Sequence, residues 1–336
     1  MCKLRMIVID EESIFKEIKE REPVSVAING PDGILLAVQS TATKISEKFG
    51  IPVYVLADTT WGSCDLNSNG AQILGADVLF NIGHTIGIPI WDKRVVMIDA
   101  FDDISFDRVA KKSAKMFHAK TVSLVTDSQH LHQVDLVRKI LEEGGAHIIV
   151  GKGKGQLNDG QVFGCEFYPA KEAAQNADVN VFLGQSDFHA AGLALSTGLA
   201  TYILDPYFNE VREVTEMAQK IQKKATLAIY AAAEMQTFGV IVGLKEGQLS
   251  KTTALKFKKE LEECGKSVQL FAMTDINNER LHNLRGIDAF VQVACPRIAT
   301  DNEFDMPVLS TPQALALIRV LRGEQLGDYL QIPHWL

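Results

Sequence analysis

The sequence feature that most constrains the fold is a strand opening that recurs at long and similar intervals. An aspartate opens an apolar run in Ala76-Asp77-Val78, in Ala177-Asp178-Val179 and in Ile287-Asp288-Ala289. The three aspartates lie 101 and 110 residues apart in the chain. A period of this length is the size of a small domain, not of a solenoid repeat. The sequence therefore predicts three similar units.

The order of elements within each unit predicts a parallel sheet. Apolar strands alternate with helical patterns, as in right-handed βαβ units. Gly50, Gly145 and Gly265 each end a helical pattern just before the second strand of a unit, where glycine serves as a helix cap. We therefore expect an α/β fold of three repeated units, each a small parallel sheet flanked by helices, arranged around a shared site. The expected domains are 1–104, 105–208 and 209–336.

Three further segments complete the expected organisation. Residues Glu11 to Arg21 form an amphipathic pattern that predicts a lead-in helix. The third unit opens with a long helical pattern from about Glu210 to Gln236. The final residues, Pro333 to Leu336, follow no pattern that predicts a structure.

Composition and charge exclude several classes of protein. The 336 residues carry 34 Lys and Arg against 42 Asp and Glu, a formal charge of −8, which argues against a nucleic-acid groove. No apolar run approaches the roughly 20 residues that span a bilayer, and no signal-peptide pattern opens the chain. Five cysteines are too few for a disulfide scaffold in a chain this long. We expect a cytoplasmic protein in a reducing compartment.

Three of the cysteines lie where α/β folds place functional side chains. Cys64, Cys165 and Cys295 each stand in a loop rich in glycine, proline or charge after a predicted strand, with one in each unit. Ligands of open α/β sheets bind at the carboxyl ends of strands. We expect each domain to deliver one thiolate to a shared centre. Cys264, beside a helix-ending glycine, is expected to be a small buried apolar residue, and Cys2 to be incidental.

The spacing of the cysteines bears on the kind of metal centre. Structural zinc usually arrives on closely spaced Cys-x-x-Cys pairs, which this chain lacks, and His84 is the one tempting fourth ligand. Three thiolates suit a [4Fe–4S] cluster whose fourth iron has no protein ligand. No Cys-x₃-Cys-x₂-Cys run and no dinucleotide or Walker motif occurs, and Gly151-Lys152-Gly153-Lys154-Gly155 is expected to be a solvated turn.

Four segments resemble a known family. They are Asp58-Thr59-Thr60-Trp61-Gly62-Ser63-Cys64-Asp65, Gly83-His84-Thr85, Gln161-Val162-Phe163-Gly164-Cys165 and Val293-Ala294-Cys295-Pro296-Arg297-Ile298. In this order they resemble the signature segments of archaeal 2-(3-amino-3-carboxypropyl)histidine synthase, the first enzyme of diphthamide biosynthesis. The chain departs from the family at Trp61, where tyrosine is usual, and at Asn81, where histidine is common.

The resemblance implies a noncanonical radical S-adenosylmethionine enzyme that works as a homodimer. Cys64, Cys165 and Cys295 would bind one [4Fe–4S] cluster, which an electron donor protein would reduce. The enzyme would cleave S-adenosylmethionine toward the methionyl γ-carbon, leaving methylthioadenosine. It would transfer the 3-amino-3-carboxypropyl group to a histidine of translation elongation factor 2.

Two more residues are candidates for contact with S-adenosylmethionine. Arg297, two residues past a cysteine, could grip its carboxylate as a planar fork, or it could pair on the surface with Asp301 or Glu303. Gln248 stands at a similar sheet edge and could contact the same ligand, or it could simply start a helix. No catalytic residue beyond these ligands is predicted.

Three alternatives to this function have different signatures. Quinolinate synthase also has three domains and a three-cysteine cluster, but the Cys-Pro-Arg-Ile context and the chain length favour the diphthamide interpretation. A second alternative is a non-catalytic partner subunit whose cluster only relays electrons or holds a heteromeric partner, and the retention of all three cysteines argues against it. A periplasmic-type binding protein would carry a signal sequence.

Overall fold

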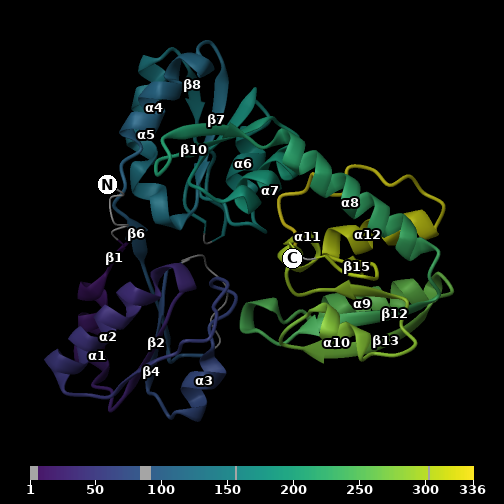
Figure 1. The fold of residues 1–336 in the computed structure, drawn as a ribbon, viewed down its shortest axis with the longest axis horizontal. Coiled ribbons are helices and arrows are strands. Elements are labelled where there is room, and N and C mark those ends of the chain that lie inside the picture. The colour runs from purple at the N-terminus through teal and green to yellow at the C-terminus, as the bar shows by residue number, and fades with distance from the viewer. Residues whose placement is uncertain (1–6, 84–91, 156, 302) are drawn as a thin grey trace.

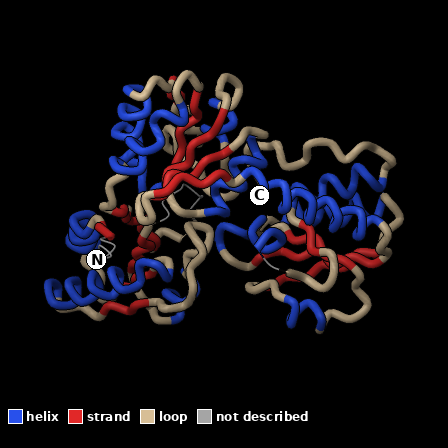
Figure 2. Tube along the Cα trace, turned by 45° about the horizontal axis from the view of Figure 1, so that its top comes forward, coloured by secondary structure: helices blue, strands red, loops and turns tan. Residues whose placement is uncertain are grey.

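The computed structural model describes residues 7–83, 92–155, 157–301 and 303–336, and it has an α/β fold. Three sheets of mainly parallel strands are each flanked by helices, and they form three bodies in the ribbon (Figures 1 and 2). Cys2, His84 and Thr85 of the sequence analysis lie outside the described residues. None of the described helices combines the length and the apolar character that crossing a bilayer requires.

The first unit is a four-stranded parallel sheet in the order β3-β2-β4-β5. The strands β2 and β4 are buried along their whole length, as expected for central strands covered on both faces. The elements are β1 (Ile7–Ile9), α1 (Glu11–Arg21), β2 (Val26–Asn29), η1 (Asp32–Ile34), α2 (Leu35–Phe49), β3 (Val53–Val55), α3 (Ser68–Ile73), β4 (Val78–Ile82), β5 (Val95–Ile98) and β6 (Ala100–Asp102). The expected helix Glu11–Arg21 is confirmed, and β1 pairs antiparallel with β6.

The second unit has the order β8-β7-β9-β10, and a fifth strand, β11, pairs antiparallel with β10. The elements are α4 (Asp107–Ser113), η2 (Ala114–Phe117), β7 (Thr121–Thr126), η3 (Ser128–Gln133), α5 (Val134–Glu143), β8 (His147–Ile149), α6 (Tyr168–Ala173), β9 (Val179–Leu183), α7 (Asp187–Thr197), β10 (Thr201–Asp205) and β11 (Glu210–Glu213). The Gly144-Gly145 helix end is where it was expected, with Gly145 at a φ of 89°.

The expected helix from Glu210 to Gln236 is wrong over its first residues. Residues Glu210–Glu213 form β11, and the helix α8 runs from Thr215 to Ala233. The β11 backbone pairs with β10, while Arg212 makes ion pairs with the carboxylates of Asp187, Asp205 and Glu210. Ladder hydrogen bonds and these ion pairs outweigh the helical propensity of these four residues, three of which are partly buried. This strand also extends the second sheet past residue 208, while the proposed domain division remains a prediction.

The third unit has the order β13-β12-β14-β15. The elements are β12 (Thr237–Gly243), η4 (Glu246–Gln248), α9 (Lys251–Glu263), β13 (Ser267–Met273), α10 (Asn278–His282), β14 (Ala289–Gln292), α11 (Pro296–Asp301), β15 (Val308–Leu309) and α12 (Thr311–Leu321). The expected helix end before Gly265 is present, with Gly265 at a φ of 81°.

The three sheets share one strand order. When the strands of each unit are numbered along the chain, the parallel strands lie side by side in the order 2-1-3-4. One apolar core continues from α7 of the second unit to α8, α12 and the sheet of the third unit. The first unit has separate cores of its own. The second and third units are therefore joined by a shared core, and the first unit meets the third through other contacts.

Candidate metal centre

The three cysteines predicted to act together line one small cavity. Cys64, Cys165 and Cys295 come from the first, second and third units, and the cavity they border has a volume of about 70 Å³. It is also lined by the aromatic rings of Trp61, Phe163, Phe188 and His189, and by Gln248, Ala294, Pro296, Arg297 and Leu336. Each thiol reaches the cavity from a loop that follows a strand of its unit, as the sequence predicted.

Cys64 lies between β3 and α3 and is held by the third unit. Its carbonyl oxygen accepts a hydrogen bond from the backbone N–H of Gly247 at 2.9 Å. The side-chain Nε2 of Gln248 donates to the Cys64 Sγ at 3.5 Å. The lack of a side chain at Gly247 permits this approach, since a Cβ there would lie 2.5 Å from the Cα of Cys64.

Polar pairs surround the same contact. The Nζ of Lys245 lies 2.6 Å from the Oδ2 of Asp65, the residue after Cys64. The backbone N–H of Ser68 donates to the Oε1 of Glu246 at 2.9 Å, and the Ser68 hydroxyl donates to the same oxygen. The segment 245–248 thus fastens the Cys64 loop by hydrogen bonds and one largely buried ion pair.

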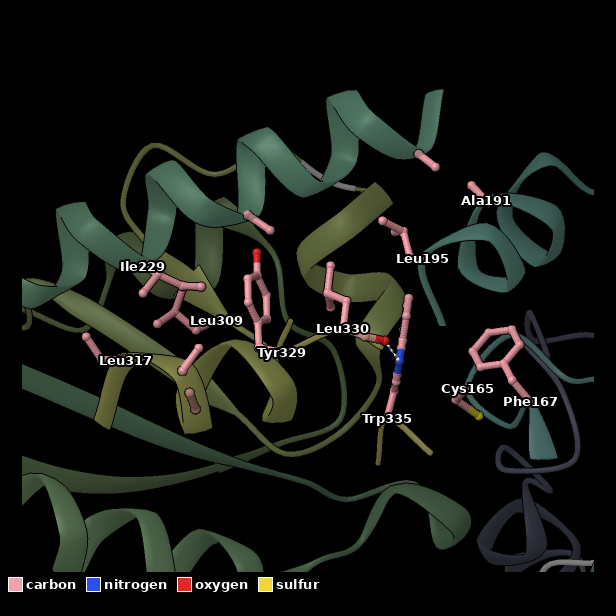
Figure 3. Close-up of a cluster of buried hydrophobic side chains, with 14 of the residues drawn as sticks. Cys165, Phe167, Ala191, Leu195, Ile229, Leu309, Leu317, Tyr329, Leu330 and Trp335 are labelled. Carbon is pink, nitrogen blue, oxygen red and sulfur yellow. Dashed lines mark hydrogen bonds between the residues drawn. The ribbon is translucent and has the colours of Figure 1, made fainter. Parts of the chain in front are cut away.

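Cys165 lies in a tight turn that the C-terminal segment covers. Backbone hydrogen bonds join Phe163 and Glu166 around it, and the N–H of Trp335 donates to the Cys165 carbonyl oxygen at 3.0 Å. The Trp335 ring packs on Phe167 with ring centroids 5.2 Å apart, and its Nε1 donates to Leu330 (Figure 3). The His334 imidazole and the Glu166 carboxylate contact each other beside this hydrogen bond. The unassigned end of the chain therefore fixes the second thiol.

Cys295 follows β14 and precedes α11, and a buried glutamine shapes its loop. The Oε1 of Gln292 accepts from the N–H groups of Ala294 and Cys295 at 2.9 and 3.0 Å, and its Nε2 donates to the Cys295 carbonyl oxygen at 2.7 Å. Gln292 was not among the predicted site residues, although a glutamine within the apolar run Phe290-Val291-Gln292-Val293 is a sequence signal for such a role. Its three hydrogen bonds stop the strand and turn the thiol toward the cavity.

Burial raises the pKa of two of the thiols, and the proximity of the other cysteines raises that of Cys165 further. Burial, followed by the neighbouring Cys295 and Cys64 thiols, raises the pKa of Cys165 well above its ordinary value. Burial also raises the pKa of Cys64, partly opposed by the hydrogen bond from Gln248. Both shifts describe thiols crowded into a poorly hydrated space, where a positive metal centre would be needed to stabilise the thiolates.

The thiols surround a space and do not converge on one point. Within residues 7–83, 92–155, 157–301 and 303–336, no group of three or more His, Cys, Asp or Glu side chains has the geometry to hold a single metal ion. In a polynuclear cluster each thiolate binds a different iron, so the thiols stand around the cluster. Cys264, by contrast, caps α9 and is not among the residues that line the cavity.

A larger cavity adjoins the first. Its volume is about 410 Å³, and Trp61, Gln248, Cys295 and Arg297 line both cavities. The guanidinium carbon of Arg297 lies 5.5 Å from the Trp61 ring centroid and 4.6 Å from that of Phe188. Gln248 is buried, with 7% of its surface exposed. The structure thus brings both predicted ligand-contacting residues to the cysteines. The side chain of Asp301, the expected surface partner of Arg297, lies outside the described residues.

Comparison with known proteins identifies relatives over nearly the whole chain. The chain is 29% identical over 324 residues to 2-(3-amino-3-carboxypropyl)histidine synthase of Pyrococcus horikoshii, covering 94% of this chain and 92% of that one. It is 28% identical to subunit 1 of the Gibberella zeae synthase, covering 87% of this chain and 64% of the fungal one. The crystal structure of Dph2 from Pyrococcus horikoshii with a 4Fe-4S cluster superposes with a TM-score of 0.84 at 27% identity, covering 98% of this chain and 96% of that one.

The family is shown by a match of this chain to a family model. The model described as "Putative diphthamide synthesis protein" matches residues 30–330, which include all three cysteines of the cavity. The chain belongs to the diphthamide synthesis protein family.

Proposed function

We propose that this chain transfers the 3-amino-3-carboxypropyl group of S-adenosylmethionine to a histidine of translation elongation factor 2, the first step of diphthamide synthesis. The observation that carries the proposal is the small cavity lined by Cys64, Cys165 and Cys295, which adjoins a cavity of ligand size. The names of the relatives support the reaction class, and the family match does not support the quinolinate synthase alternative.

The residues around the small cavity fit a [4Fe–4S] cluster. Among the described residues that line the cavity there are three thiols, aromatic rings and no fourth sulfur, which suits a cluster with one iron left open to another ligand. The cavity volume of about 70 Å³ is well below the roughly 300–1,000 Å³ of pockets for organic ligands. When bound, such a cluster supplies an electron at low potential and an open iron. Cys64, Cys165 and Cys295 would hold it.

The larger cavity fits S-adenosylmethionine. Its volume of about 410 Å³ lies within the usual range for ligand pockets. The Arg297 guanidinium offers a planar fork to the carboxylate of the methionyl group, and the rings of Trp61 and Phe188 fix its orientation. The Gln248 side chain would face both the ligand and Cys64. These residues would set which carbon of the sulfonium approaches the iron.

The same proposal extends to the organisation of the protein. We take the three sheets, which share one strand order, as repeats of one unit that surround the cluster. The corresponding domains remain 1–104, 105–208 and 209–336. The group would be transferred as an aminocarboxypropyl radical, so the cluster would need an electron donor protein to reduce it. The chain would modify elongation factor 2 in the cytoplasm. The bond broken would be the one toward the methionyl γ-carbon.

One anaerobic assay tests the proposed reaction. Reduced, iron-loaded protein would be mixed with S-adenosylmethionine and elongation factor 2, and the small molecules and the protein mass would be analysed. Methylthioadenosine together with a mass gain of one aminocarboxypropyl group on the factor is expected. Deoxyadenosine as the main product, or equal turnover without reductant, would contradict the proposal. A cluster that is reduced normally but gives no transfer would favour an electron-relay subunit.

The role of Arg297 can be separated from cluster binding. Arg297→Lys keeps the charge but loses the planar fork, so transfer should slow by about tenfold or more while iron content stays unchanged. The Michaelis constant for S-adenosylmethionine should rise in the same variant. An unchanged rate would assign Arg297 to the stacking contacts with Trp61 and Phe188 alone.

A further inference from the structure

The charges of helix α9 run against its own dipole. Its first nine residues, from Lys251, carry four lysines and no acid, and its last four, up to Glu263, carry three glutamates. The N-terminal end of a helix is the positive end of its dipole, so both groups of charges destabilise the helix. Helix α1 has the stabilising order, with Glu11 and Glu12 in the first turn and basic residues in the last. The order of charges in α9 therefore does not serve the stability of this helix.

Three of the lysines surround one exposed leucine. Leu255 lies in the middle of α9 and is 57% exposed. Positions three and four residues away are its neighbours on the helix surface, and they include Lys251, Lys258 and Lys259. The opposite face of α9 packs on the third sheet, so this face is turned to solvent (Figure 1). An apolar centre with a polar rim is the usual anatomy of a protein-docking surface, and we call these four residues the α9 patch.

The α9 patch is positive on a chain that is negative overall. The chain has a formal charge of −8, and none of the ion pairs within the described part of the chain includes Lys251. Lys258 and Lys259 pair with Glu262 and Glu263 one turn further on, at solvent-accessible positions where such pairs contribute little and exchange readily. Helix α3, which contacts the segment before α9, carries no charge that could neutralise the patch.

The α9 patch lies close along the chain to the Cys64 thiol. The backbone N–H of Gly247 donates to the Cys64 carbonyl oxygen at 2.9 Å, and the Gln248 Nε2 donates to the Cys64 Sγ at 3.5 Å. Lys251 stands three residues after Gln248, so their Cα atoms are at most roughly 11 Å apart. Leu249, between them, is 49% exposed. A protein seated on the patch would thus be linked to the thiol through one short hydrogen-bonded segment.

From these features we infer that the α9 patch is the docking surface of an acidic iron–sulfur electron carrier. The inference rests on the proposed function, in which a cluster held in part by Cys64 must be reduced. One electron would leave the reduced carrier and enter the cluster on the Cys64 side. The carrier is then oxidised by one electron and the cluster reduced by one electron, and no bond or proton is transferred.

An electron carrier fits the patch better than the protein substrate does. None of the α9 residues lines either cavity beside the cysteines, whereas an acceptor histidine must reach the larger cavity. Electron transfer needs only proximity, and redox partners pair through small surfaces that charge attraction brings together. The negative charge of the whole chain would repel an acidic carrier elsewhere, so the patch would also select where the carrier docks.

Reduction kinetics of the iron-loaded full chain test the inference. The probe is an acidic plant-type [2Fe–2S] ferredoxin in its reduced form, and the reaction is followed by stopped-flow absorbance. In Lys251→Glu with Lys259→Glu the second-order rate should fall at least about tenfold at low ionic strength, because the patch then repels the probe. The wild-type rate should itself fall steeply between about 0.01 and 0.1 M ionic strength, as the Debye length shrinks from about 30 to 10 Å.

Controls separate docking from damage to the site. Lys251→Glu places an acid in the first turn of α9, where it favours the helix, so the double variant should keep its circular dichroism and its iron. Its reduction by photoreduced deazariboflavin, a small uncharged reductant, should be unchanged. Lys16→Glu with Lys19→Glu makes the same change of charge at exposed positions of α1 and should keep the wild-type rate with ferredoxin.

Binding without a cluster gives a readout that does not depend on redox chemistry. Titration calorimetry of the iron-free chain with oxidised ferredoxin should give a dissociation constant that Leu255→Ala raises severalfold, because the apolar centre of the patch is lost. Leu36→Ala is the matched control, since Leu36 is 84% exposed on α2, and its affinity should equal that of the wild type. Equal affinities in the wild type and in Leu255→Ala would refute the apolar centre.

The kinetic outcomes also distinguish this inference from the proposed function. An unchanged ferredoxin rate in the α9 double variant, or an equal loss in the α1 variant or with deazariboflavin, would overturn the docking surface. Normal reduction in the α9 variant with loss of transfer to elongation factor 2 would also overturn it, because the patch would then serve the protein substrate. Reduction that requires the patch, without any transfer by the wild-type chain, would support the docking surface and contradict the proposed reaction.

Discussion

The Cys64 loop and the Cys165 loop present their thiols to the same cavity but are fixed by different forces. Cys64 is held by polar groups of the segment 245–248, including the Lys245–Asp65 pair. Cys165 lies on an apolar core that continues from the second unit into the third, and Trp335 covers it. The Cys64 loop is thus fastened by a few hydrogen bonds and one ion pair, and the Cys165 loop by a large buried surface.

This difference indicates where the site can loosen. Polar contacts exchange with water at little net cost, whereas separating an apolar core exposes area at roughly 25 cal/mol per Å². We expect the contact between the first and third units to open before the contact between the second and third. A bound metal centre would contribute most to the weaker contact, because its ligands join all three units.

Loss of a thiol should have the largest effect. Cys64→Ala, Cys165→Ala and Cys295→Ala should each strip or degrade the proposed cluster, whichever force holds the loop, because each change removes one of its three proposed ligands. Cys264→Ala, outside the cavity, should keep full iron. Iron and sulfide per chain after anaerobic reconstitution measure the effect. Normal iron in all three single variants would refute the shared site.

Removing the Trp335 ring from the apolar core beside Cys165 should cause a large loss of stability. Trp335 is 2% exposed and packs on Phe167, so Trp335→Ala should cost about 3–5 kcal/mol of unfolding free energy. Trp61, which is 55% exposed, is the matched control, and Trp61→Ala should change stability by less than about 0.5 kcal/mol. Urea denaturation followed by circular dichroism distinguishes them. Equal effects of the two changes would mean that the C-terminal segment does not fix the Cys165 loop.

The polar contact that holds the Cys64 loop can be tested at Gly247, where the backbone packs directly against Cys64. In Gly247→Ala the new Cβ would meet the Cα of Cys64, so the first unit must move away and iron content should fall severalfold. Gly323→Ala is a control for backbone strain: Gly323 has a φ of 76° and open space around it. That control should lose about 1–2 kcal/mol of stability and keep its iron. Full iron in Gly247→Ala would show that the Cys64 loop tolerates displacement.

The smallest effect should come from a single hydrogen bond in the polar contact. Ser68→Ala removes the hydroxyl that donates to Glu246 but keeps the backbone N–H bond to the same oxygen. We expect a loss of about 1 kcal/mol in unfolding free energy. Thr43→Ala, which removes an exposed hydroxyl bond on α2, should change stability less. A cost of several kcal/mol for Ser68→Ala would mean that the polar contact is as strong as the apolar core.

The local elements could be predicted because they depend on nearby residues. Helix α1 has the predicted bounds, α5 and α9 end just before the predicted glycines, and β4, β9 and β14 each begin directly after a predicted aspartate. The start of the long helix was wrong because β11 is held by β10 and by the ion pairs of Arg212, which no local pattern reveals. A strand paired at a sheet edge is decided by its neighbour.

The sequence by itself determined that three cysteines stand at strand ends in units of similar design, since strand ends and loops follow from short-range patterns. Only the tertiary structure decided that they meet. Gln248 contacts Cys64 across 184 positions of the chain, and Trp335 covers Cys165 from an end without any pattern. Such contacts depend on how whole sheets pack, because hydrogen bonds and burial act between surfaces that the folded units bring together.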